Sequence, residues 1–259
     1  MHRPRSKRKP VAVTALAIAG LLVAAGIAWA SADGNVSHVR FQFSPSTVPK
    51  TTYKSGSLSV HVDTVFKNPG NNPLGGWTHR VQLWFDNDFR FNTDSVPKCN
   101  KNLANTTEAQ AMALCGSSLV GKGTASATNG NGAHIPGCVI VFNGAKNSLG
   151  QPTLILHSRF VMQPGTCTNP ATNTGGSVDA ILAGVLKPAN KTGYGKMLDV
   201  NNIDHNSLPM EAFDAKIQKG AYVQARCSHS TRTWHVIGKH TYSDGQSNTA
   251  TVSQKCTPG

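Results

Sequence analysis

The chain lacks the short motifs by which several enzyme classes are recognised. It has no G-x-S-x-G elbow of the kind that carries the nucleophile of many serine hydrolases. It also has no C-x-x-C pair of the kind common in zinc sites. Its two glutamates, Glu108 and Glu211, are better explained by helix capping and solvation than as paired glycosidase carboxylates. We therefore expect no catalytic, cofactor-binding or metal-binding residues and predict that the protein is not an enzyme.

Acidic residues are scarce, since 12 Asp and Glu accompany 25 Lys and Arg. Five of the basic residues lie within the first ten positions, and the chain without residues 1–32 keeps 20 basic against 12 acidic residues, a net charge of +8. The remaining Lys and Arg are scattered, which is typical of a solubilising surface. Because no zinc finger, helix-turn-helix or basic–aromatic stripe occurs, we predict no nucleic-acid partner.

Long apolar runs are confined to the N-terminus. The basic first ten residues precede an apolar run over residues 11–29, which leads into the small-residue sequence A-W-A-S-A at residues 28–32. This is the pattern of a secretory signal peptide. We predict a signal at residues 1–32, cleaved after Ala32 or alternatively after Ala30, and a secreted domain at residues 33–259 that does not contact the membrane after cleavage. The alternative is an uncleaved anchor, because a run approaching 20 residues can span a bilayer.

Alternation of apolar and polar residues, the pattern of half-buried strands, recurs along the rest of the chain. Val39, Phe41 and Phe43 show it first, and turn dipeptides such as Asp244-Gly245 separate later segments. About ten strands at this spacing predict an all-β fold, an antiparallel β-sandwich of immunoglobulin-like or jelly-roll-like type. The expected strands lie at residues 39–43, 58–62, 81–85, 120–128, 138–142, 153–162, 178–186, 215–227, 233–242 and 248–253.

One segment is typical of a helix. The sequence N-T-T-E at residues 105–108 offers a threonine cap and an early acid, and the alanine-rich residues 109–114 follow. This predicts a single short helix of about two turns. No repeat of fixed period and no Pro- or Ser-rich linker divides the chain, so we expect one domain, with two closely packed sandwich lobes as the alternative.

All six cysteines lie beyond the predicted signal, which indicates an oxidising compartment and disulfide bonds. Six cysteines allow 15 pairings, and we predict the sequential one: Cys99 with Cys115, Cys138 with Cys167 and Cys227 with Cys256. The first pair would close the helical segment, with a stabilisation of roughly 3 kcal/mol.

A disulfide between Cys227 and Cys256 restricts how the strands near the C-terminus can be arranged. A flat meander of residues 215–256 would hold Cys227 and Cys256 roughly 9.5 Å apart, whereas a disulfide needs Cα atoms within about 7 Å. Either the strand at 215–227 lies in the facing sheet, or the chain end folds across the rim.

Two clusters of polar residues have some features of metal sites, but each has a simpler explanation. Asp86 and Asp88, with Asp94 nearby, resemble the start of a calcium loop, but the required glycine and glutamate are missing, so we favour a turn in which these side chains bond their own backbone. His229, His235 and His240 lie close in sequence, but His235 and His240 should point to opposite faces of one strand. We interpret these three as ordinary surface histidines.

Trp77, Trp84 and Trp234 are candidate platforms for sugars or protein partners, and among them the candidate contact residue is Trp84. It lies out of phase with Val81, Leu83 and Phe85, so it should face outward or into a second layer. An exposed tryptophan would mark a contact surface, while burial between layers is the favoured alternative.

Several segments resemble uncharacterised secreted proteins of high-GC Gram-positive bacteria. They are residues 83–92, 97–99, 115–123, 242–245 and 254–256. The resemblance implies a secreted β-sandwich and transfers no functional residues.

These observations predict a secreted, disulfide-stabilised, non-catalytic protein with a binding or structural role at the cell envelope. Anionic cell-wall polymers and envelope proteins are the expected partners, and no cofactor is expected. The alternative is a secreted hydrolase of envelope or extracellular polymers whose catalytic residues are dispersed over several strands.

Overall fold

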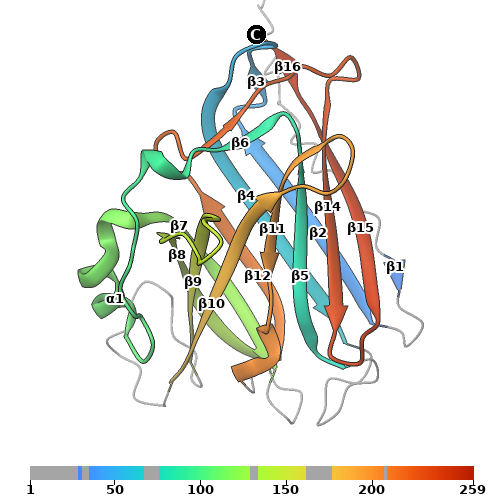
Figure 1. Ribbon diagram of the computed structural model, residues 1–259. Helices are drawn as coiled ribbons and strands as arrows, with labels where there is room; N and C mark the ends of the chain where they lie inside the picture. Colours follow the sequence, from blue (N-terminus) through green and yellow to red (C-terminus); the bar gives the residue numbers. More distant parts are fainter. Residues whose placement is uncertain (1–28, 31–34, 67–75, 129–133, 162–176, 207–208) are drawn as a thin grey trace, which may run out of the picture.

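The computed structural model describes residues 29–30, 35–66, 76–128, 134–161, 177–206 and 209–259. Within these residues most of the chain forms antiparallel strands, which stack in two layers with a short helix on one side (Figure 1). The predicted all-β sandwich with one short helix is confirmed. The predicted signal lies outside the described residues except for Trp29–Ala30, and no helix of the described part has the length and hydropathy to cross a bilayer.

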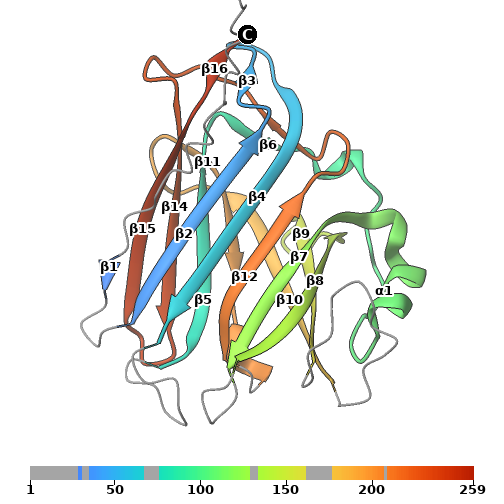
Figure 2. The same ribbon diagram turned by 180° about the vertical axis from the view of Figure 1, so that it is seen from behind.

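The layers are parts of one continuous sheet. Its order is β1-β2-β4-β12-β7-β8-β9-β10-β11-β5-β14-β15. Strands β2, β4, β12 and β7 form one layer and β10, β11, β5 and β14 the other (Figures 1 and 2). The strands are β1 Trp29–Ala30, β2 Val36–Ser44, β3 Thr47–Val48, β4 Lys54–Val65, β5 Thr78–Asp86, β6 Phe89–Phe91, β7 Leu119–Thr128, β8 His134–Gly144, β9 Thr153–Val161, β10 Ser177–Pro188, β11 Tyr194–Val200, β12 Met210–Ile217, β13 Val223–Ala225, β14 Thr233–Tyr242, β15 Ser247–Lys255 and β16 Thr257–Pro258.

Two strand predictions need correction. The single strand expected at 215–227 is two strands, β12 and β13, because the chain turns between them at Gly220, whose φ is +49°. Strand β11 was not expected, although it pairs with both β10 and β5 in the middle of its layer. Gly193 lies just before it and Gly195 and Lys196 lie near its start, which weakens the apolar alternation that identifies a strand.

The two ends of the sheet meet along β2 and β15, which lie side by side (Figure 2). Side chains of β15 bridge this seam. The Gln254 amide donates to the carbonyl of Phe43 at 2.9 Å and accepts from its backbone N–H at 2.7 Å. Asn248 donates to the carbonyl of Asn35 at 2.9 Å. These amides satisfy backbone groups that a strand at the edge of a sheet would expose.

The helix α1, Glu108–Cys115, covers the outside of β8. Thr107 caps it, and Gln110 returns a hydrogen bond to the Thr107 backbone, which completes a capping box. A disulfide joins Cys99 and Cys115, and both pack with Ile140 and Phe142 of β8. The predicted helix, its cap and its disulfide are confirmed.

The second confirmed disulfide joins Cys227 and Cys256, with Cα atoms 5.9 Å apart. Strand β13 pairs with β4 and β6, whereas β14 and β15 pair with each other and with β5. The segment that leads to Cys227 is therefore not part of the β14–β15 meander, which was the first of the two expected solutions. No cysteine among the described residues is free, and Cys138 is disulfide-bonded. Its predicted partner, Cys167, lies outside the described residues.

Candidate ligand-binding cavity

The space between the layers is incompletely filled. An interior cavity of ≈ 80 Å³ lies among side chains from β4, β5, β6, β8, β9, β10, β11 and β12, and every residue that lines it is Leu, Val, Ile, Phe, Met or Ala. Ala215 is the smallest of these residues. A void of this size costs about 2 kcal/mol of stability relative to a filled core. Because its wall offers no polar side chain, water would gain nothing there.

A smaller and more polar pocket adjoins this cavity. It measures ≈ 20 Å³ and shares five wall residues with the larger one. The shared residues are Val62, Val81, Ile203, Met210 and Phe213. Its wall includes the polar residues Asp63, Thr64, Thr78, Glu211 and His240, although most of the surface that it presents is apolar. The apolar space therefore adjoins an end where polar residues gather.

A chain of hydroxyl groups supports the polar end. Tyr242 bonds Ser37 at 2.5 Å, Ser37 bonds Thr64 at 3.0 Å, and Thr78 donates to Thr64 at 3.3 Å. Asn248 donates to the Tyr242 hydroxyl at 2.9 Å. All five side chains are buried, so these hydrogen bonds replace the ones that the same groups would make with water in the unfolded chain.

His240 is the residue of this region that the sequence interpretation missed. It is 1% exposed, and its Nδ1 has no hydrogen-bond partner. Burial lowers the pKa of His240 to about 4, so the imidazole is neutral at pH 7. The prediction that it lies at the surface is wrong. The signal was present: His240 shares its parity with Trp234 and Val236, and all three face inward.

The outer face of the same strands carries a histidine–carboxylate cluster. Asp63 accepts from His38 Nδ1 at 2.8 Å and from His61 Nε2 at 3.1 Å. The hydrogen bond to Asp63 raises the pKa of His61. Burial acts to raise the pKa of Asp63, but the bonds from both imidazoles outweigh it and lower that pKa. Asp63 is therefore ionised beside the polar pocket.

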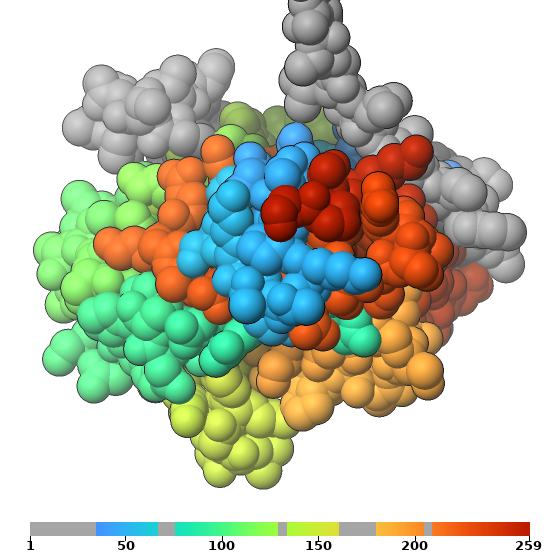
Figure 3. Space-filling view, turned by 90° about the horizontal axis from the view of Figure 1, so that it is seen from above, coloured from blue at the N-terminus to red at the C-terminus, as the bar shows by residue number. Residues whose placement is uncertain are grey.

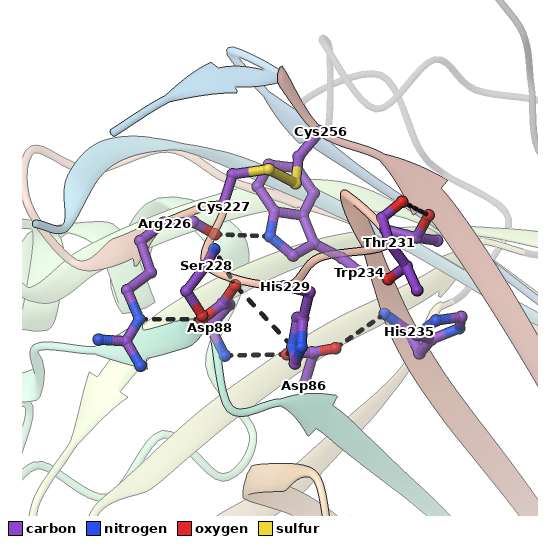
Figure 4. The surroundings of a disulfide bond; sticks show 11 residues. Asp86, Asp88, Arg226, Cys227, Ser228, His229, Thr231, Trp234, His235 and Cys256 are labelled. Carbon is purple, nitrogen blue, oxygen red and sulfur yellow. Dashed lines mark hydrogen bonds and ion pairs between the residues drawn. A yellow bond between two sulfur atoms is a disulfide. The ribbon is translucent and has the colours of Figure 1, made fainter. Parts of the chain in front are cut away.

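A second cluster lies at the turn between β5 and β6 (Figure 4). Ligand atoms of Asp86, Asp88 and His229 come within 4.8 Å of one another, which is close enough for a shared metal ion. The predicted turn is confirmed, since Asp86 accepts from the backbone N–H of Asp88 at 2.9 Å. The contacts between this turn and the residues that follow β13 were not expected.

The carboxylate oxygens of this second cluster already accept hydrogen bonds from groups of the protein. Asp88, 0% exposed, accepts from Arg226 Nε at 2.9 Å, from the Ser228 backbone N–H at 2.7 Å and from the Ser228 hydroxyl at 2.6 Å. Asp86 accepts from His229 Nε2 at 2.7 Å. A guanidinium in this place repels a cation, so we interpret the set as a structural brace beside Cys227 and name it the Asp88 clamp.

Trp84 is not an exposed platform. The residue is 4% exposed, its Nε1 donates to Asn190 at 2.9 Å, and Lys191 Nζ lies 5.2 Å from the ring centre. The expectation that it points away from Val81, Leu83 and Phe85 fits, but the turn between β10 and β11 covers it. A contact surface at Trp84 would need that turn to move.

No protein-family model, curated protein or solved structure matches this chain. Roles for its residues therefore rest on their own geometry. By that measure, the apolar cavity with its polar end is the stronger candidate, because it combines open space with a buried imidazole nitrogen, His240 Nδ1, that lacks a partner.

Proposed function

We propose that the protein is a secreted, non-catalytic binding protein of the cell envelope whose interior holds an apolar ligand. The observation that carries the proposal is the cavity of ≈ 80 Å³ with an entirely apolar wall. Engineered cavities of similar character bind small apolar molecules while excluding water. The ligand would gain contact area that the surrounding side chains now lack.

The covalent structure supports a place outside the cytoplasm. Disulfides persist in oxidising compartments, and the described part contains the bonds Cys99–Cys115 and Cys227–Cys256. The sequence before the sandwich has the pattern of an export signal. The scattered basic surface suits weak contact with anionic wall polymers or envelope proteins, and residues 83–92 and others resemble secreted proteins of high-GC Gram-positive bacteria.

The side-chain clusters favour binding over hydrolysis. Ser228 donates its hydroxyl proton to Asp88, while His229 bonds Asp86, so this serine has no imidazole to activate it. The carboxylates of Asp86 and Asp88 are committed to protein donors and do not face the cavity. The rival proposal, a secreted hydrolase, has no comparable support in the described residues.

Methyl NMR under xenon tests the binding proposal directly. Xenon enters dry apolar cavities, so the methyl signals of Leu156 and Leu182, which line the cavity, should shift with gas pressure. The methyls of Leu149, which is 78% exposed, should not shift. Equal shifts at all three residues, or none, would count against a ligand cavity.

A matched pair of variants gives the control. Ala215→Val adds two carbons to the cavity wall and should abolish the xenon shifts. Ala125→Val makes the same change at a buried alanine that does not line the cavity, and it should leave the shifts in place.

A further inference from the structure

We propose that the polar pocket at His240 binds an uncharged hydroxyl head group of the ligand, whose apolar chain occupies the larger cavity. The ligand would then be a small neutral amphiphile of the alkyl alcohol class, rather than a hydrocarbon or a carboxylate anion. This inference rests on the proposed function and assigns the chemistry of the same site.

The arrangement of the two spaces supports the first part. Both contact Val62, Val81 and Phe213, so the polar pocket adjoins the apolar cavity at the place where the head of a bound chain would lie. The pocket measures ≈ 20 Å³. A space of that size holds one small group, such as a hydroxyl or a water molecule.

Hydrogen-bond accounting shows which group lacks a partner. The hydroxyls of Tyr242, Ser37, Thr64 and Thr78 are joined by three contacts, and Thr64 also bonds Tyr242. Four contacts match the four hydroxyl protons, so these groups satisfy one another. The unpaired atom beside the pocket is therefore not one of these hydroxyls.

The unpaired atom is on His240. Its Nδ1 is buried and lacks a hydrogen-bond partner. An added hydroxyl can donate to Nδ1, or accept from it when Nδ1 carries the proton. A hydrocarbon end offers neither function and would leave Nδ1 unpaired.

The charges around the pocket disfavour an anion. Asp63 and Glu211 line it, and Glu211 is held by His134 Nδ1 at 2.6 Å. His38 and His61 offset Asp63 on its outer side, but they do not line the pocket. Burial holds the pKa of His240 near 4, so the inner side offers no positive charge at pH 7. A carboxylate head would face like charges without a cation.

Three ligands of equal chain length separate the possibilities. 1-Hexanol, 1-fluorohexane and hexanoate would be titrated into the methyl-labelled protein at pH 7.5, with affinities taken from the Leu156 and Leu182 signals. We expect 1-hexanol to bind about 5-fold more tightly than 1-fluorohexane and at least 10-fold more tightly than hexanoate. Fluorine matches a hydroxyl in size but is more apolar, so equal or tighter binding of 1-fluorohexane would overturn the inference.

The variant His240→Phe provides the second measurement. It should weaken 1-hexanol about 5-fold and change 1-fluorohexane less than 2-fold, because only the hydroxyl contact is lost. An unchanged preference for 1-hexanol in this variant would overturn the inference. If the variant does not fold, the comparison of the three ligands on the unmodified protein still decides.

The two proposals fail in different ways. If none of the three ligands shifts the cavity methyls, the binding function itself is wrong. If all bind in the order of their hydrophobicity, or if a crystal structure with 1-hexanol retains a water in the pocket beside His240, the cavity binds ligands but the head-group assignment is wrong.

Discussion

One end of the sandwich interior is filled and clamped, whereas the region toward β9–β12 retains open space. At the clamped end, the rings of Phe43, Phe89 and Trp234 contact one another with centroids 5.3–5.6 Å apart. The Cys227–Cys256 disulfide and the Asp88 clamp lie against them (Figure 4). Viewed from above, the segments around β3 in blue and the C-terminus in red lie over this end (Figure 3).

The difference follows from where large side chains are placed. Aromatic residues make up only 7% of the chain, and many of them gather at the clamped end. The cavity wall is mainly Leu and Val, with Ala215 at one strand centre, and these residues leave a void between the layers. Stability is thus concentrated at one end and open space at the other, which is the division that the proposed ligand site requires.

A large effect is expected at the clamp. Asp88→Ala should lower the free energy of unfolding by about 3 kcal/mol, because it leaves the Arg226 guanidinium and the Ser228 donors without an acceptor. Urea denaturation measures the change. Asp94→Ala removes an exposed partner of Lys98 and should leave the midpoint unchanged. Equal losses in the two variants would show that burial of the clamp contributes nothing.

Removal of either described disulfide should cost about 3 kcal/mol in the loop-entropy model, slightly more for Cys227–Cys256 because it closes the longer loop. The sharper prediction concerns coupling. Cys227 lies between Arg226 and Ser228, so loss of its disulfide and Asp88→Ala should be non-additive by more than about 0.5 kcal/mol. The same cycle with Cys99 and Cys115 should be additive. A coupling of similar size in both cycles would contradict a clamp specific to one end.

The cavity end should show its own pH dependence. Below pH 6.5 the unfolded chain protonates His240, while the folded protein does not until its pKa of about 4, so the free energy of unfolding falls as the pH falls through this window. Its full extent is about 3 kcal/mol. His61 has a raised pKa, so its contribution is complete below pH 6.5 and is lost as the pH rises through that raised value.

The difference between the native chain and His240→Phe isolates the His240 contribution, since His61 is common to both. Unfolding curves from pH 4 to 7.5 should show a flatter profile for the variant. Parallel profiles would mean that His240 is not buried as a neutral imidazole.

The smallest effect expected is from filling the void. Ala215→Val should raise the free energy of unfolding by about 1 kcal/mol, because the added carbons gain contacts in existing space. Ala125→Val adds the same carbons at a buried residue that lines neither of the two described cavities, so overpacking should lower stability by about 1 kcal/mol. Thermal denaturation distinguishes these signs, and destabilisation by both variants would argue that the cavity is not open in solution.

Local features of the fold were predictable because local rules produce them. Alternation identified most strands, the threonine at residue 107 capped the helix as expected, and Cys99–Cys115 closes a segment only 16 positions long. The candidate site was not predictable to the same degree. Thr64 and Thr78 come from different strands, and His240 from a third, so their approach depends on strand order rather than on spacing in sequence.

The amino-acid sequence by itself determined the strand pattern, the capped helix and the sequential pairs Cys99–Cys115 and Cys227–Cys256, since each depends on neighbours within a few tens of residues. Only the tertiary structure decided that Asp88 meets Arg226, that Trp84 is covered, and that an apolar cavity ends beside His240. The physical reason is that void space and unpaired buried groups are properties of how two layers fit together, which no single strand encodes.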